Sequence, residues 1–136
     1  VFYVQYAHAR TYSVFRQAAE KLPGLDLGFG ALTGADLSLL KSEADLELIK
    51  SLAQWPRIVA SAAEAHEPHR IAFYLYELAS AFHGFWAKGN QDVALRFVNA
   101  DDSMLTSARL ALVAAVRQVL VNGLSLLGVT APEELS

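Results

Sequence analysis

The feature that most constrains the fold is the long apolar run between Met104 and Val129. A run of this length could cross a membrane as a helix, because about 20 apolar residues span the hydrocarbon core of a bilayer. Arg109 and Arg117 interrupt the run, however, and guanidinium groups are costly in lipid. We therefore predict a helix over residues 103–127 that is buried in a water-soluble helical bundle, with no membrane partner.

Residues 2–22 carry a second helical pattern, in which apolar side chains recur with the 3.6-residue period of an α-helix. The predicted core stripe of this helix consists of Val4, Ala7, Thr11, Phe15, Ala18 and Leu22. Pro23 and Gly24 end it, and loops are expected around residues 25–35 and 89–100. Further helices are predicted over residues 36–54, 56–65 and 68–88, with a possible break near Lys41. Residues 1–136 should thus form one all-α domain, a bundle of about five helices.

Composition excludes several classes of site. The chain has no cysteine, and its four histidines lack the spacing of metal ligands on a helix, so we expect no metal site. No grouping of residues indicates catalysis, and a net charge of −3 argues against general binding to nucleic acids such as DNA. Residues 1–19 and 103–132 nevertheless contain arginines and no acid, which predicts a modest basic face on an acidic body.

The segment 3–10 reads Tyr-Val-Gln-Tyr-Ala-His-Ala-Arg. It places aromatic rings, an amide, an imidazole and a guanidinium on about two turns of helix, a mixture suited to stacking on bases and bonding to their edges. The segment resembles the Tyr-x-Gln-Tyr-Ala-His-x-Arg motif of arginyl-tRNA synthetases, on the helix that joins their catalytic and anticodon-binding domains. Residues 78–86, 108–110, 119–128 and 131–133 resemble later segments of the same family, so the resemblance covers nearly the whole chain.

The resemblance implies that this chain, which begins within the motif, is the C-terminal DALR-type anticodon-binding domain of a longer class I aminoacyl-tRNA synthetase. Such a domain takes the splayed anticodon loop of tRNA and recognises its middle cytosine, next to the catalytic domain of the same parent chain. The parent enzyme would be a cytoplasmic monomer that attaches arginine to tRNA with ATP and Mg²⁺. The fragment itself would hold no cofactor and would lack the catalytic site.

Six residues are candidate RNA contacts by the same resemblance. Arg10 and Arg16 lie roughly 120° apart around the first helix, so they bracket one exposed face and would bond to phosphate and base edges. Tyr6 and His83 would supply stacking surfaces, and Gln5 would make a polar contact. The sixth candidate is Leu135, an apolar lid where the family usually has a terminal methionine.

Structural alternatives exist for the residues of the first helix and the aromatic cluster. The arginines could pair with acids, and His8 could be either a packed histidine or an RNA contact. Phe82, Phe85 and Trp86 share a helical face and favour the core, although Trp86 is also a weak RNA candidate.

The two arginines of the last predicted helix should differ in their surroundings. Arg109 should be partly buried and paired with Glu77, whereas Arg117 should face outward, where it would touch RNA or water. A second function also remains open. The aromatic and basic first helix could dock an acidic protein partner, in a helical interaction module that does not bind RNA.

Overall fold

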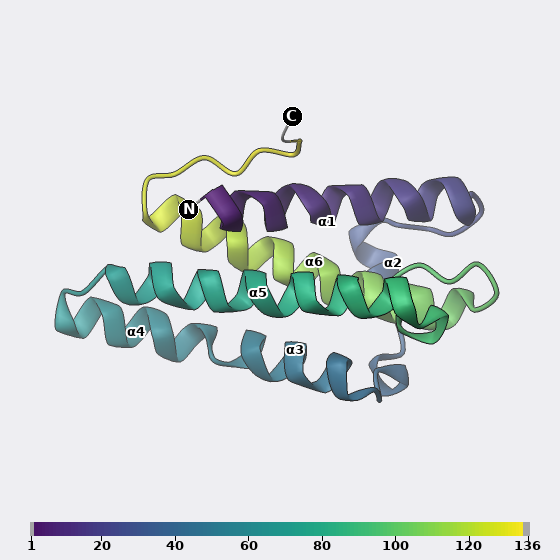
Figure 1. The fold of residues 1–136 in the computed structure, drawn as a ribbon, viewed down its shortest axis with the longest axis horizontal. Helices are drawn as coiled ribbons and strands as arrows, with labels where there is room; N and C mark the ends of the chain where they lie inside the picture. Colours follow the sequence, from purple (N-terminus) through teal and green to yellow (C-terminus); the bar gives the residue numbers. More distant parts are fainter. Residues whose placement is uncertain (1, 135–136) are drawn as a thin grey trace.

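The computed structural model describes residues 2–134, which contain helices and no strand. The elements in chain order are α1 (Phe2–Lys21), α2 (Phe29–Thr33), the 3₁₀-helix η1 (Leu37–Leu39), α3 (Glu43–Ala53), α4 (Trp55–Ala65), α5 (His69–Gln91), the 3₁₀-helix η2 (Val93–Leu95) and α6 (Ser103–Leu126). In Figure 1, α5 runs between α1 on one side and the α3–α4 pair on the other, and α6 crosses obliquely behind them. The predicted all-α bundle is confirmed, with five long helices and the short α2.

Helix α6 is a core helix, and it contacts α1, α2, α3 and α5. By length and composition alone it could span a membrane, but its buried side chains pack against these neighbours, as predicted for a core helix. Asp102 caps its first turn, where the carboxylate accepts a hydrogen bond of 3.0 Å from the N–H of Leu105. Gly123 lets α5 approach closely, because a Cβ at this position would stand only 2.5 Å from a methyl group of Leu75.

The region before α4 departs most from the predicted boundaries. The helix expected over residues 36–54 is broken near Lys41, as anticipated, into η1 and α3. The break is stabilised by a capping box, in which Ser42 Oγ accepts from the N–H of Asp45 while the Asp45 carboxylate accepts from the N–H of Ser42. The loop predicted over residues 25–35 instead contains α2, which packs against α6.

Arg109 is buried, but its predicted pairing with Glu77 is wrong. Its Nε and Nη2 donate to the two carboxylate oxygens of Asp45 at 3.3 and 3.2 Å, while Nη1 donates to the backbone carbonyls of Ala94 and Arg96. Glu77 lies exposed on α5. The reason is topological: α3 packs directly on α6, and the capping box holds the Asp45 carboxylate against this face.

Candidate nucleic-acid interface

Helix α1 separates a buried stripe from an exposed face. Four members of the predicted stripe are buried, and Phe15 and Leu22 are half-buried against the core. Val14, which lies just beside the predicted stripe, is also buried, as are His8 and Ala9. Tyr6 lies on the opposite face with 43% of its surface exposed, so the amphipathic character of α1 orients its aromatic and basic residues outward.

Three predicted RNA contacts meet in one groove. Tyr6, Arg10 and Arg16 line it on α1, and Glu133 and Glu134 of the C-terminal tail face them. The groove has a volume of 540 Å³. Sites for small organic ligands typically measure about 300–1,000 Å³, so it has room for a nucleotide. It thus combines a phenol ring with two guanidinium groups, as stacking on a base and binding its phosphate require.

The C-terminal tail forms one side of this groove because three contacts hold it along α1 (Figure 1). The Gln5 amide donates to the carbonyl of Thr130 at 2.9 Å, and His8 Nδ1 lies 2.7 Å from the carbonyl oxygen of Pro132. Arg16 approaches Glu134 at 4.0 Å. Gln5, a predicted RNA contact, therefore faces the tail instead of lining the groove. Leu135 lies outside the described residues.

His8 is a packed histidine, which settles the alternative that its sequence position left open. Only 1% of its surface is exposed. Burial lowers its pKa, and the nearby Arg117 adds to this effect, whereas the hydrogen bond to Pro132 opposes it. The neutral ring with its proton on Nδ1 fits these contacts, because Nε2 is buried and has no hydrogen-bond partner among residues 2–134. His8 thus holds the tail and does not face the groove.

Arg117 does not face outward as predicted. Its guanidinium carbon lies 3.7 Å from the ring centroid of Tyr12 and 4.5 Å from that of Phe15, and its Nε donates to Thr11 Oγ1 at 3.0 Å. Burial lowers its pKa. The orientation of Arg117 follows from the packing of α6 against α1, which turns this side of α6 toward the first helix. Arg117 is therefore a packing residue on the inner side of the interface.

His83 joins the groove through Arg10, whose Nη1 lies 3.4 Å from His83 Nδ1. Burial lowers the pKa of His83, and the positive charge of Arg10 lowers it further, so the neutral ring can accept a hydrogen bond from Arg10. The guanidinium of Arg10 also lies 5.0 Å above the ring of Trp86. Phe82 and Phe85 are buried as predicted, whereas Trp86 is half-buried and supports Arg10.

Two aromatic residues of this surface were not among the predicted RNA contacts, although Tyr3 is one of the rings of segment 3–10. The Tyr3 ring centroid lies 4.9 Å from both His83 and Tyr76, so three rings form a continuous cluster across α1 and α5. Tyr3 and Tyr76 are 36% and 56% exposed. Spacing could have identified both, because Tyr3 is one helical turn before Tyr6 and Tyr76 is two turns before His83.

A comparison with known families decides the identity of this fold. Residues 4–135 match the family described as DALR anticodon binding domain, from the α1 groove to the tail. The chain belongs to this family. Among its curated relatives, the arginine–tRNA ligases of Methylobacterium nodulans and Beijerinckia indica are 65% and 58% identical to it over 135 residues. These alignments cover 99% of this chain but only 23% of each relative.

The groove of this DALR domain is lined by the phenol ring of Tyr6 and by the guanidinium groups of Arg10 and Arg16. The acids that reach the groove are Glu133 and Glu134, which both lie exposed on the tail. These groups are suited to binding a nucleic acid. The arginines donate charged hydrogen bonds, and the phenol and imidazole rings offer flat surfaces for stacking.

Proposed function

We propose that this DALR domain binds the anticodon loop of tRNA as part of an arginine–tRNA ligase. The observation that carries the proposal is the convergence of Tyr6, Arg10 and Arg16 on one open groove, beside the rings of Tyr3 and His83. The names of its relatives support the choice of arginine tRNA. The complete enzyme would attach arginine to tRNA in the cytoplasm with ATP and Mg²⁺, through its catalytic domain.

The two arginines of the groove have different roles in this proposal. Arg10 is held between His83 and Trp86, so its guanidinium is ordered before RNA arrives and little further entropy is lost on binding. It would bond to a base edge while the base stacks on Tyr6 or on the Tyr3–His83 cluster. The middle cytosine of the anticodon is the base we assign to this position.

Arg16 would bind a phosphate of the loop. Its only ion pair among the described residues is with Glu134 at 4.0 Å, and 52% and 81% of the two side chains are exposed. An exposed pair of this kind contributes only about 0–1 kcal/mol. A phosphate can therefore replace Glu134 as the partner of Arg16. Breaking the Arg16–Glu134 pair loses little free energy, and the phosphate is a stronger hydrogen-bond acceptor.

A titration with stem-loop RNAs tests the proposal. Arg16→Ala should weaken binding of the arginine anticodon stem-loop by at least ~1 kcal/mol, as expected for a lost base-edge or phosphate contact. The control is Arg57→Ala, which removes an exposed arginine on α4, outside the groove. Both titrations should use the same stated salt concentration, because phosphate contacts make RNA affinity depend on salt.

Base preference separates RNA reading from docking of an acidic protein partner. The wild-type domain should prefer the loop with the middle cytosine over a loop with that base replaced. Equal affinity for the two loops, together with unchanged binding by Arg16→Ala, would show that the groove does not read the anticodon.

A further inference from the structure

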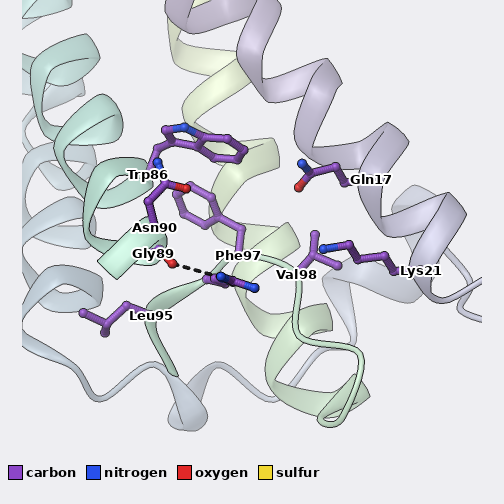
Figure 2. A pocket seen from close by; sticks show the side chains of 9 residues that line it. Gln17, Lys21, Trp86, Gly89, Asn90, Leu95, Phe97 and Val98 are labelled. Atoms are coloured by element: carbon purple, nitrogen blue, oxygen red, sulfur yellow. Dashed lines mark hydrogen bonds between the residues drawn. The ribbon is translucent and has the colours of Figure 1, made fainter. Parts of the chain in front are cut away.

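A second cavity lies beyond the groove, where the last turns of α1 and α5 meet the segment that follows η2 (Figure 2). Its volume is 120 Å³. Gln17 and Lys21 reach it from α1, and the rings of Trp86 and Phe97 form its opposite wall (Figure 2). None of the residues assigned to the groove lines this cavity, so it is a separate site on the same side of the bundle.

The side chains that line the cavity include two cations and no carboxylate. Lys21 and Arg96 carry the charges, and Gln17 and Asn90 add two amides. Within residues 2–134, neither cation takes part in an ion pair. Ammonium and guanidinium groups can only donate hydrogen bonds, so two uncompensated cations beside one small cavity favour an anion that accepts from both.

Gly89 orients one of these cations. Its carbonyl accepts a 3.0 Å hydrogen bond from Arg96 Nε, drawn as the dashed line in Figure 2. A Cβ on Gly89 would stand 3.1 Å from Arg96 Cα, so glycine allows the segment after η2 to come this close. The bond fixes the guanidinium through Nε, and the two terminal nitrogens of Arg96 make no hydrogen bond in the part of the chain that the structure describes. The geometry thus prepares these two nitrogens for a ligand.

Size and position indicate which anion fits. The cavity is well below the roughly 300–1,000 Å³ of sites that enclose an organic ligand, so it suits a single phosphate group better than a base with its sugar. It also adjoins the groove through Trp86, whose ring lies under the Arg10 guanidinium and packs on Phe97. Lys21 is about 16 Å along α1 from Arg10, a distance that a few nucleotides of an RNA strand can bridge.

We propose that this cavity binds a backbone phosphate of the tRNA strand that continues from the anticodon groove, through Lys21 and Arg96. The assignment rests on the proposed function, because it takes the RNA in the groove as the source of the phosphate. A phosphate contact fixes the register of a nucleic acid and carries no sequence information of its own. The cavity would therefore add affinity and orientation, and the groove would add base preference.

The test compares two variants that each lose two positive charges. Lys21→Gln/Arg96→Gln removes the cations of the cavity, and Lys50→Gln/Arg57→Gln removes two exposed cations from α3 and α4. The cavity variant should bind the arginine anticodon stem-loop about five-fold or more weakly, the scale expected for losing charged hydrogen bonds. The loss should be equal for the loop with its middle base replaced. The slope of log affinity against log salt should fall by about 0.7–0.9 for the lost phosphate contact.

The outcomes separate the cavity from the groove. Wild-type affinity and salt slope in the cavity variant, with Arg16→Ala still weakened, would overturn the phosphate site and leave the proposed function intact. If the cavity variant bound more weakly while Arg16→Ala bound like the wild type, and the wild type showed no base preference, the phosphate site would be supported and anticodon reading overturned. Lys21→Gln by itself guards against a folding defect, because Lys21 makes no hydrogen bond through its side chain within residues 2–134. Lys21→Gln should also weaken binding of both stem-loops equally, but less than the double variant does.

Discussion

Arg109 and Arg16 place the same side chain in opposite surroundings. The Arg109 side chain is 3% exposed and donates to Asp45 and to two backbone carbonyls, so its charge and geometry are satisfied within the fold. The Arg16 side chain is 52% exposed and has only a distant partner in Glu134 and a hydrogen bond to Ser13. A guanidinium whose hydrogen bonds and counter-charge are supplied within the fold stabilises the fold. A guanidinium with only weak partners in the fold is available to a ligand.

The difference extends to the two regions that contain these arginines. The α3–α6 contact contains the buried ion pair between Asp45 and Arg109. Arg109 also donates to the carbonyl of Arg96 and so holds the segment that follows η2. The contact between α1 and the tail is held by a few separate polar contacts, and two buried nitrogens near it, His8 Nε2 and Arg117 Nη2, lack a partner in the described chain. We infer that the first region supplies stability and that the second supplies the binding surface.

The largest expected effect would come from breaking the buried pair. Arg109→Met should lower the free energy of unfolding by about 3–5 kcal/mol, because it leaves the fully buried Asp45 carboxylate without its counter-charge. Urea unfolding measures the change. Adding Asp45→Asn should recover part of the loss, since the amide oxygen can still cap α3 and no buried charge remains. If Arg109→Met lowered the free energy of unfolding by less than about 1 kcal/mol, the Arg109–Asp45 pair would stabilise the fold no more than an exposed ion pair does.

The contact between α1 and the tail should weaken in acid. The expected loss of stability is smaller than that from breaking the Arg109–Asp45 pair and larger than that from changing Glu134. The pKa of His8 in the fold lies below its ordinary value of 6.5, so the unfolded chain binds more protons once the pH falls below about 6.5. The free energy of unfolding should therefore decrease as the pH falls through this range. Protonation would place a second buried N–H at Nε2, beside the positive charge of Arg117.

The contribution of His8 is isolated by comparing unfolding at pH 7.5 and 5.5 in the wild type and in His8→Asn. Asparagine can still donate to the carbonyl of Pro132 but does not titrate. His83, whose pKa is also lowered, remains in both proteins and accounts for the residual pH dependence. The same pH dependence in both proteins would mean that His8 does not control this contact.

The smallest expected effect concerns the exposed pair in the groove. Glu134→Gln should change the free energy of unfolding by no more than about 0.5 kcal/mol, as is usual for surface positions. It should raise the affinity for the anticodon stem-loop by less than about five-fold, because it removes a weak competitor for Arg16. Glu47→Gln, on the exposed side of α3, controls for the change in net charge. A stability loss above about 1 kcal/mol would show that the tail and Arg16 form a tight pair.

The long helices were predictable because their periodicity repeats over many turns. The apolar stripe of α1 and the interrupted apolar run of α6 identified both helices and their buried faces. Helix α2 was missed, because five residues are too few for a period to show. Gly28, Gly30 and Gly34, which lie before, within and after α2, also indicated a loop. The break before α3 was placed correctly, but its capping box was not recognised.

The groove was predictable only in part. The helical period predicted that Arg10 and Arg16 bracket one exposed face of α1, and the family resemblance predicted that both arginines and Tyr6 contact RNA. Gln5 was predicted to contact RNA, but its amide donates to the carbonyl of Thr130 in the tail, 125 residues away along the chain. The spacing of Tyr3 and Tyr76 from predicted contacts could have drawn attention to both residues, but only the packing of α1 against α5 decides that their rings stack.

The amino-acid sequence by itself determined the family, the long helices and the outward orientation of the aromatic and basic residues on α1. The helices and the orientation of their faces are local properties, since each depends on residues within a few turns, whereas the family resemblance draws on motifs along nearly the whole chain. Only the tertiary structure decided that Arg109 pairs with Asp45, 64 residues away, that Arg117 turns inward, and that His8 holds Pro132 across 124 residues. Periodicity fixes which face of a helix is apolar, but the packing of the helices decides which polar group meets which partner.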